Sequence, residues 1–320
     1  MQDITLQLQK MFKDRLKIDE PLLKHLNFRI GGPAKWFVEV STIEELQHAL
    51  KIAKDADVPT FVLGGGSNTL GADVGFDGLV VKLAMREFSI NGTTVRAEAG
   101  VITAALARAT ANVGLSGFAW AVSLPGTIGG AVRGNAGCFG GEMRDSISKV
   151  EVLRDGKIIE LSKEDLHFGY RESSIKNSND IVLSVTLELE IGDALELKDQ
   201  LVESLEKRKG SQPLYAGSAG CIFKNFEFTQ DAQVDQLRQQ IAIPESMMQN
   251  KRISAGWIID QLGLKGTRIG DASISEEHGN FIINHGNATA SDVKALIDLV
   301  KSDALTKFGI QLIEEVQYLK

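Results

Sequence analysis

Residues 123–143 contain a density of glycine that constrains the chain more than any other feature of its sequence. The stretch reads SLPGTIGGAVRGNAGCFGGEM and holds seven glycines and one proline. A second cluster, LGGGSN, occupies residues 63–68. Because glycine lacks a Cβ, it lets main-chain N–H groups approach a ligand and adopts positive φ without strain. Neither loop carries the Lys-Ser/Thr pair of a nucleoside triphosphatase loop, so together they indicate a dinucleotide pyrophosphate held by main-chain dipoles.

The loops also lack the spacing of a nicotinamide-type Rossmann site. That site has GxGxxG followed about 20 residues later by an acidic residue that binds the ribose. The LGGGSN cluster alone is a weak signal, because glycine-rich turns after strands are common, and it gains weight from the second cluster. For the longer cluster a tight packing turn is the less favoured interpretation, since packing rarely needs so many glycines together with Asn135.

Composition restricts the class of protein further. The chain has 320 residues, of which 43% are hydrophobic, and a formal net charge of -7. This length can supply two or three domain cores. Lysines and arginines alternate with acidic residues, so the sequence carries no basic surface for nucleic acid or an anionic membrane. It shows neither an apolar signal-peptide core nor a run of about 18 apolar residues, and we expect a cytoplasmic, monomeric protein.

Hydrophobic periodicity predicts three domains, at 1–85, 86–209 and 210–308, and a terminal strand at 309–320 that carries Glu315. The first should begin with a docking helix within its first twenty residues. The expected strands of the first domain are 37–40, 60–63 and 79–83, with a helix that a Thr42–Glu45 capping box opens. The LGGGSN loop begins at the carboxyl end of the second of these strands.

The sequence pattern of the later domains predicts hairpins and longer helices. Asn91-Gly92 and Asp155-Gly156 each join two short segments, which predicts two hairpins with primed turns. Residues 181–191 alternate as a half-buried strand does. The expected helices are 102–113, 195–209, a stretch near 231–240, 255–262 and 291–307, the last with Ser291 as N-cap and Gly309 as its end. Residues 310–319 are strand-like.

The two cysteines differ in their neighbours. Cys221 follows the small residues 217–220 and lies three positions before Lys224. Backbone amides and a cation favour the thiolate form of a cysteine, so Cys221 is either a proton-exchanging group or an inert buried one. Cys138 has no basic neighbour in its loop, and we expect it to be inert. Neither cysteine lies in a CxxC pattern, so we expect a reduced pair and no metal site.

Four more polar positions could carry chemistry. Arg171, in FGYRES, has the planar guanidinium that suits a carboxylate or enolate, although a solvated loop arginine would look the same. Glu315 and its neighbour Glu314 should point to opposite faces of the expected strand, so one of them points inward. His278 and Asn280, in EEHGNF, are either functional or ordinary turn residues.

Together these segments resemble the UDP-N-acetylenolpyruvoylglucosamine reductases of peptidoglycan synthesis. The similarity runs from about residue 20 to the end, in order and without large gaps. The matching segments are NFRIGGPA from Asn27, LGGGSN from Leu63, GLSGFAWAVSLPGTIGGAVRGNAGCFGGE from Gly114, FGYRES from Phe168, SAGCIFKN from Ser218, AGWIIDQLGLKG from Ala255 and NFIINHGNATASDV from Asn280.

The resemblance implies an α+β flavoprotein with a two-domain, vanillyl-alcohol-oxidase-like FAD-binding unit and an α/β substrate-binding domain. NADPH would reduce the FAD, whose N5 would then deliver a hydride to the enolpyruvyl C3 of UDP-N-acetylglucosamine enolpyruvate. Cys221 occupies the place of the family's proton donor, most often a serine, and would protonate C2 to give UDP-N-acetylmuramate. Arg171 and Glu315 match the positions thought to polarise the substrate carboxylate and stabilise the enolate. Glu315 would be protonated or separated from that carboxylate by a donor.

The resemblance also implies two sets of binding residues and no metal. The cofactor set is Gly64, Gly65, Gly66, Ser67, Asn68, Pro125, Gly126, Thr127, Gly129, Gly130, Asn135 and Gly137. The substrate set is Tyr170, Arg208, Lys224 and Asn225.

The chain departs from the family's pattern at four places. The run 191–209 is too short for an insertion that carries a substrate-binding tyrosine in one subclass, so the chain resembles the shorter subclass. Ser211 stands where a basic residue is frequent, which bears on one phosphate or carboxylate contact. Phe226 and Glu314 stand where proline is frequent, and neither should change the chemistry.

Two other functions fit the glycine loops. One is an FAD-dependent alcohol oxidase of the same cofactor-binding superfamily, which Cys221 and the two Asn-bearing turns fit poorly. The other is a flavin-binding protein without turnover. Oxygen-driven turnover that ignores the enolpyruvyl sugar would indicate the oxidase, and a flavin band with neither activity would indicate the binding protein.

Overall fold

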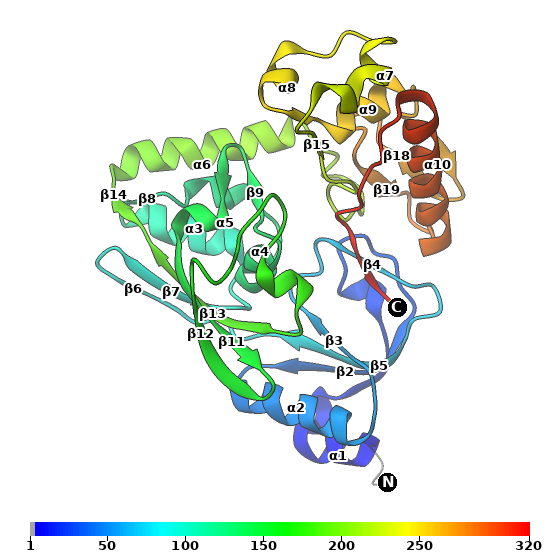
Figure 1. The fold of residues 1–320 in the computed structure, drawn as a ribbon. Coiled ribbons are helices and arrows are strands. Elements are labelled where there is room, and N and C mark those ends of the chain that lie inside the picture. Colours follow the sequence, from blue (N-terminus) through cyan, green and yellow to red (C-terminus); the bar gives the residue numbers. More distant parts are fainter. Residues whose placement is uncertain (1–3) are drawn as a thin grey trace. The chain divides into compact units, whose positions relative to one another are not determined.

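In the computed structural model, which describes residues 4–320, the chain forms two compact units (Figure 1). The first unit consists of Met1–Glu20, Ala34–Gly65 and Phe76–Gly210, and the second of Pro21–Pro33, Gly66–Gly75 and Ser211–Lys320. Each unit has a hydrophobic core of its own, and both mix helices with strands, which agrees with the predicted α+β class. Within residues 4–320, no helix combines the length and the apolar character that crossing a bilayer would need.

A mainly parallel sheet in the first unit leads into the LGGGSN loop. Its strands are β1 (Lys17–Pro21), β2 (Pro33–Val40), β5 (Phe76–Leu83) and β3 (Thr60–Leu63), in that order, and β5 pairs in parallel with both β2 and β3. α2 (Ile43–Asp55) connects β2 to β3, which lie on either side of β5 in the sheet. α1 (Ile4–Phe12) packs against α2 and buries Ile4, Leu8 and Phe12.

The cap of α2 matches the sequence prediction in one of its two halves. The Thr42 side chain accepts a hydrogen bond from the Glu45 amide at 3.2 Å. The Glu45 carboxylate, however, accepts from the amide of Ser41 at 2.8 Å and not from that of Thr42. It is also ion-paired with Arg15, which ties the segment after α1 to the start of α2.

An antiparallel sheet forms the rest of the first unit's framework. Its order is β12 (Lys157–Ser162), β11 (Ile147–Arg154), β13 (Ile181–Glu188), β7 (Thr94–Glu98) and β6 (Phe88–Asn91). Both predicted hairpins are present. Asp155 and Gly156 have φ of +50° and +79°, as a type I′ turn requires. The turn predicted at Asn91-Gly92 was wrong by one residue. Asn91 pairs with Thr94, so the two-residue loop is Gly92-Thr93.

Strand β13 is more deeply buried than its alternating sequence predicts. Residues 182–187 are all buried, because β11 and β7 flank the strand and α4 (Ile128–Arg133) packs against it. The strand also ends at Glu188, and a separate strand β14 (Glu190–Ile191) pairs with β8 (Leu115–Ser116). The predicted helices at 102–113 and 195–209 are confirmed as α3 (Thr103–Asn112) and α6 (Ala194–Lys209).

The second unit combines small sheets with helices. A three-stranded antiparallel sheet has the order β17 (Arg268–Ile269), β18 (Ala272–Ile274), β19 (Ile282–Asn284). The other strand pairs are β15 (Phe226–Glu227) with β16 (Arg252–Ile253), and β4 (Thr69–Gly71) in parallel with β20 (Gln317–Leu319). The helices are α7 (Asp235–Arg238), α8 (Glu245–Gln249), α9 (Ala255–Gln261) and α10 (Ala290–Phe308).

The longest helix, α10, begins earlier than predicted. Its N-cap is Thr289 and not Ser291, because Thr289 and Asp292 exchange side-chain-to-amide hydrogen bonds of 3.0 Å in a capping box. The Ser291 hydroxyl instead donates to Asp73 at 2.9 Å. Gly309, with φ +68°, ends the helix as predicted.

The terminal strand is shorter than predicted, and Glu315 lies outside it. Only Gln317–Leu319 pair as a strand. The amides of Glu315 and Val316 both donate to the Ile222 carbonyl, at 2.7 and 3.4 Å. Successive amides of a regular strand point to opposite sides, so this shared acceptor interrupts the ladder just before β20.

Replacing Asp73 by alanine should destabilise the chain through α10. The Asp73 carboxylate accepts from the Ala290 amide at 2.6 Å and from the Ser291 amide at 3.0 Å, two groups that no residue within the helix can bond. We expect Asp73→Ala to lower the free energy of unfolding by about 1–2 kcal/mol in urea titrations. Asp77→Ala, which breaks only the exposed Lys35 pair, should cost less than about 0.5 kcal/mol. Equal losses in the two variants would contradict the capping role.

Candidate active site

The two glycine clusters meet in the first unit. A Cβ on Gly64 would lie 2.7 Å from Thr127 Oγ1, and a Cβ on Gly65 would lie 2.6 Å from the Gly126 Cα. The loop after β3 therefore touches the loop before α4 so closely that neither position admits a side chain. The result is a main-chain surface of the kind that a pyrophosphate can approach.

The remainder of LGGGSN belongs to the second unit. Gly66 has φ +64°, and a Cβ there would lie 2.2 Å from the His25 carbonyl oxygen. Asn68 follows Ser67 and contacts the chain terminus, because its Nδ2 donates to the Glu315 carbonyl at 3.1 Å and its own carbonyl accepts from the Gln317 amide at 2.9 Å. The loop thus contributes residues to both units.

Two buried oxygens of the predicted cofactor set stand out. Thr127 Oγ1 and Asn68 Oδ1 are shielded from solvent, and neither finds a hydrogen-bond partner among the described residues. A buried polar atom without a partner costs free energy and calls for an explanation. In each unit, the orphan oxygen lies in a glycine-lined loop, which suits a bound group with donors.

Two other glycines of the predicted cofactor set are required by packing within the protein itself. A Cβ on Gly129 would lie 2.8 Å from the Ala99 Cβ, and one on Gly137 would lie 2.5 Å from the Gly141 carbonyl oxygen. Gly130 has open space, with Thr127 Oγ1 nearest at 3.8 Å. Packing alone therefore explains Gly129 and Gly137, whereas Gly130 leaves room beside α4.

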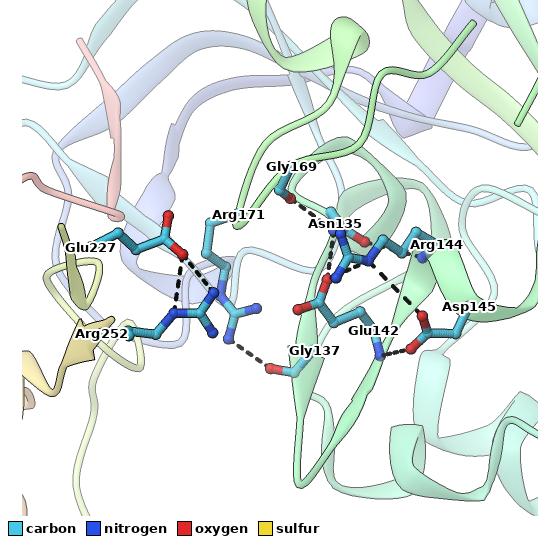
Figure 2. A network of polar contacts seen from close by, with 9 residues as sticks. All are labelled: Asn135, Gly137, Glu142, Arg144, Asp145, Gly169, Arg171, Glu227 and Arg252. Carbon is cyan, nitrogen blue, oxygen red and sulfur yellow. Dashed lines mark hydrogen bonds and ion pairs between the residues drawn. The ribbon is translucent and has the colours of Figure 1, made fainter. Parts of the chain in front are cut away.

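Asn135 uses its side chain to join two loops (Figure 2). The residue is buried, and its Nδ2 donates to Glu142 Oε2 at 2.9 Å and to the Gly169 carbonyl at 2.8 Å. Its Oδ1 accepts from the Arg144 amide at 3.1 Å. Both donors and the acceptor are thus engaged within the protein, and the amide positions loop 169–172.

Arg171 lies at the tip of that loop in a strained conformation. Gly169 and Glu172 exchange backbone hydrogen bonds of 3.0 and 3.2 Å, which leaves Tyr170 and Arg171 as the turn. Arg171 has φ +56°, a region that non-glycine residues occupy at a cost of about 1–2 kcal/mol. Its guanidinium donates to the Gly137 carbonyl at 2.6 Å and lies 5.2 Å from the centre of the Tyr170 ring. Strain of this kind is typical of functional positions.

Arg208 and Cys138 lie near the same part of the first unit. Arg208, at the end of α6, donates to the Ser123 carbonyl, and Cys138 Sγ lies 3.3 Å from Ser123 Oγ. Burial raises the pKa of the Cys138 thiol, although the Ser123 hydrogen bond and the charges of Arg208 and Arg171 act in the opposite direction. A raised pKa disfavours the thiolate, which is the reactive form of a cysteine.

In the second unit, main-chain pairing brings the segment after Cys221 beside Glu315. The Ile222 carbonyl accepts from the Glu315 amide at 2.7 Å, and the Lys224 amide donates to the Ile313 carbonyl at 2.8 Å. Phe223 forms a bridge with Glu314 between these two bonds. Cys221 and Glu315 are 94 positions apart in the sequence, and this pairing places them on neighbouring segments.

Glu314 and Glu315, which we expected to point to opposite faces of a strand, are both half-buried and both precede β20. Glu314 Oε1 lies 2.7 Å from Lys301 Nζ, and its Oε2 accepts from the Tyr318 hydroxyl. Burial opposes ionisation of Glu314, but the hydrogen bonds from Lys301 and Tyr318 hold its pKa below the usual value. Glu314 is therefore a structural carboxylate, while the main chain of Glu315 is fixed by Ile222 and Asn68.

An open pocket of about 460 Å³ lies next to Asn225, and it is lined by Asn225, Ser246, Met247, Asn250, Arg252 and Ser254. Arg252 is ion-paired with Glu227 at 2.5 Å (Figure 2). Asn225 Oδ1 accepts from the Ala255 amide at 3.1 Å, which fixes the start of α9. No motif singled out Arg252 or the α8 residues, because they come together only through the β15–β16 pairing.

Comparison with known proteins gives a consistent result. Residues 34–162 match the family "FAD binding domain", and residues 212–319 match "UDP-N-acetylenolpyruvoylglucosamine reductase, C-terminal domain". The UDP-N-acetylenolpyruvoylglucosamine reductase of Clostridioides difficile strain 630 is 38% identical and covers 99% of this chain and 98% of the relative. That of Alkaliphilus oremlandii is also 38% identical, with 95% and 93% covered. The crystal structure of the Thermus caldophilus reductase is 34% identical, with a TM-score of 0.75 over 95% of this chain and 98% of the other.

The Cys138 thiol should react slowly with iodoacetamide in the native protein. Because burial raises its pKa, less thiolate is present at a given pH than in the unfolded chain, and thiolate is the reactive form. We expect peptide mapping to show alkylation of Cys138 slower than that of a model thiol at pH 8, with acceleration as the pH rises and when the chain is unfolded. As the pH rises through this raised pKa, the folded state should lose stability, since ionisation favours the unfolded chain. A native rate equal to that of the unfolded chain would overturn the assignment.

Proposed function

The chain belongs to the UDP-N-acetylenolpyruvoylglucosamine reductases, and from this premise we propose how its own residues perform the family's reaction. The enzyme uses NADPH and FAD to reduce UDP-N-acetylglucosamine enolpyruvate to UDP-N-acetylmuramate, a step in the synthesis of peptidoglycan precursors. The relatives do not favour an alcohol oxidase or a flavin-binding protein without turnover.

The residues present fit FAD. Gly64 and Gly65 press against Gly126 and Thr127 without room for side chains, and Thr127 Oγ1 is a buried acceptor that the described residues leave unpaired. When bound, FAD would supply the hydride chemistry that links NADPH to the enolpyruvyl C3. We assign the contacts to the cofactor set named from the sequence, with the side chain of Asn135 acting on the protein's own loops.

Arg171 would hold the substrate carboxylate. Hydride addition at C3 leaves negative charge at C2 that spreads into the adjoining carboxylate, so a fixed cation there lowers the barrier. The left-handed backbone of Arg171 and its bond to the Gly137 carbonyl support this role, because they preset the guanidinium before substrate arrives. Tyr170 and Arg208 would line the substrate site in the same unit.

Cys221 would donate the proton that completes the reaction. Its S–H bond breaks, a C–H bond forms at C2, and the resulting thiolate recovers a proton from water. Glu315 would assist at the enolate as the protonated acid or through an intervening donor. The observation that supports this pairing most is the 2.7 Å hydrogen bond between the Glu315 amide and the Ile222 carbonyl, which holds Glu315 beside the residue that follows Cys221. Lys224 and Asn225 would bind substrate from the same segment.

Three coarser features complete the proposal. We assign residues 1–85 and 86–209 to two FAD-binding subdomains, 210–308 to a substrate-binding domain, and 309–320 to a terminal segment that carries Glu315. The separate parallel and antiparallel sheets support the first division. We also place the enzyme in the cytoplasm, for which the two cysteines outside disulfides are the supporting observation, and we propose that it is a monomer.

Thr127→Val should act in opposite directions on the apoenzyme and on FAD binding. Removing a buried hydroxyl without a protein partner should raise the stability of the FAD-free chain by about 1 kcal/mol. If that oxygen accepts from FAD, the same change should weaken FAD binding by about tenfold. Differential scanning calorimetry of the stripped protein and titration of its flavin absorption band measure the two effects. Unchanged FAD affinity would remove Thr127 from the cofactor site.

A pair of glycine variants provides a matched test of the loops. Gly65→Ala would push a Cβ to 2.6 Å from the Gly126 Cα and should abolish FAD binding. Gly134→Ala meets only the Gly130 carbonyl at 3.8 Å and should keep it. If both variants retained bound flavin, the two loops would not form the cofactor site.

Cys221→Ala should separate the two half-reactions. NADPH should still reduce the flavin, while reoxidation by the enolpyruvyl substrate should slow by about 10²–10⁴-fold, the usual contribution of a general acid. Cys221→Ser keeps a proton donor of nearly the same size and should lose much less. Stopped-flow absorption of the flavin follows both steps. Equal loss in both half-reactions would make Cys221 structural, and substrate-independent NADPH oxidation by the wild type would refute the reductase itself.

A further inference from the structure

From the sequence, Asn280 is either a functional residue or an ordinary turn residue. Its hydrogen bonds in the structure show which part of the chain it holds. It is 3% exposed. Its Oδ1 accepts from the Phe223 amide at 2.9 Å, and its Nδ2 donates to the Phe223 carbonyl at 2.8 Å. The Asn280 carbonyl also accepts from the Ile222 amide at 2.9 Å. One residue therefore supplies three hydrogen bonds to the two residues that follow Cys221.

These bonds replace a missing strand partner. An amide side chain has the same donor and acceptor as a peptide group, so Asn280 can bond both main-chain groups of Phe223 as a neighbouring strand would. Cys221 itself bridges to Phe281, the next residue along. On the opposite edge, residues 313–316 bond Ile222 and Lys224. The segment 221–224 is thus held from both sides, although it is not part of a regular sheet.

The turn around Asn280 is fixed in its own right. The Asn280 amide donates to His278 Nδ1 at 3.2 Å, and burial lowers the pKa of His278, which favours the neutral ring that can accept this bond. The Phe281 amide donates to the His278 carbonyl at 2.9 Å. A Cβ on Gly279 would lie 2.8 Å from the Gly256 carbonyl oxygen, so this turn packs tightly on α9.

We propose that Asn280 is a positioning residue for the reaction, whose side chain sets the place of the Cys221 thiol by holding the main chain of Phe223. The inference rests on the proposed role of Cys221. A proton donor must lie within hydrogen-bond reach of the carbon it protonates, and an error of about 1 Å can cost about a hundredfold in rate. Loss of the Asn280 side chain would leave the Phe223 amide and carbonyl unpaired in the interior and let the segment shift.

The test compares half-reactions of the FAD-loaded enzyme. In Asn280→Ala, reoxidation of reduced flavin by the enolpyruvyl substrate should slow by about 10- to 100-fold, while reduction by NADPH stays within about twofold. Asn280→Asp is a near-isosteric second variant that keeps the acceptor for Phe223 but replaces the donor by an oxygen, and it should show the same selective loss. Equal slowing of both half-reactions in the variants would overturn the proposal.

A double-mutant cycle with Cys221→Ala separates positioning from general weakening. If Asn280 acts through the thiol, its removal should slow reoxidation by no more than about twofold when Cys221 is already alanine. A loss that is as large in the Cys221→Ala background as in the wild type would mean that Asn280 serves the fold only. The rate of iodoacetamide labelling of Cys221, followed by peptide mapping over pH, should also change in Asn280→Ala, and an unchanged profile would count against the proposal.

Asn284→Ala is the matched control. Asn284 is 6% exposed and its side chain also bonds main-chain groups, namely the Phe28 carbonyl at 3.1 Å and the Gly286 amide at 2.7 Å, but none in 221–224. It should lose stability as Asn280→Ala does and keep the ratio of the two half-reactions. A different result would contradict the proposed function itself, namely that the wild-type enzyme shows no substrate-dependent reoxidation of the flavin.

Discussion

Close approach of main chain to main chain is the constraint on which both units depend. In the first unit, the Gly126 Cα lies 2.6 Å from where a Cβ of Gly65 would be, and in the second the His25 carbonyl oxygen lies 2.2 Å from where a Cβ of Gly66 would be. A side chain at either position would force two backbone segments apart. The LGGGSN loop contributes residues to both units. Its three consecutive glycines present main-chain groups, and not side chains, to the segments that it contacts within each unit.

The proposed catalytic groups share a second physical feature, since none lies within a regular helix or strand. Arg171 is at the tip of a two-residue turn with φ +56°, and Cys221 and Glu315 lie on segments joined by single bridges. Irregular backbone needs partners from elsewhere, and buried asparagines supply them in both units. Asn135 bonds the Gly169 carbonyl, and Asn280 bonds both main-chain groups of Phe223. A buried asparagine side chain thus supplies the hydrogen bonds that a neighbouring strand would otherwise make to the main chain.

These asparagines also show where prediction from the sequence ends. Periodic and capped elements such as α3, α6 and the Asp155-Gly156 hairpin were predicted, because their signals lie within a few residues. The N-cap of α10 was misplaced at Ser291, because serine is at least as good a cap as threonine; in the structure Thr289 forms a capping box with Asp292, and Ser291 donates to Asp73. The bond of Asn280 to Phe223 spans 57 positions and leaves no local pattern. The family's motifs named the candidate residues, but only the fold showed which of them hold the others.

The neighbouring glutamates show that a fixed backbone can be reached by different physical means. A proline at position 314, frequent in the resembled family, would fix its own φ near −65° by its ring. Glu314 lacks that restraint, yet its carboxylate is held by Lys301 of α10 and by the Tyr318 hydroxyl, and Phe223 bridges to it. The restraint on residue 314 is therefore an ion pair instead of a covalent ring, and the Glu314 side chain in this pair is about one-fifth exposed. Salt screening weakens such a pair but not a ring, so the conformation of Glu314 depends on electrostatics that a proline at this position would not need.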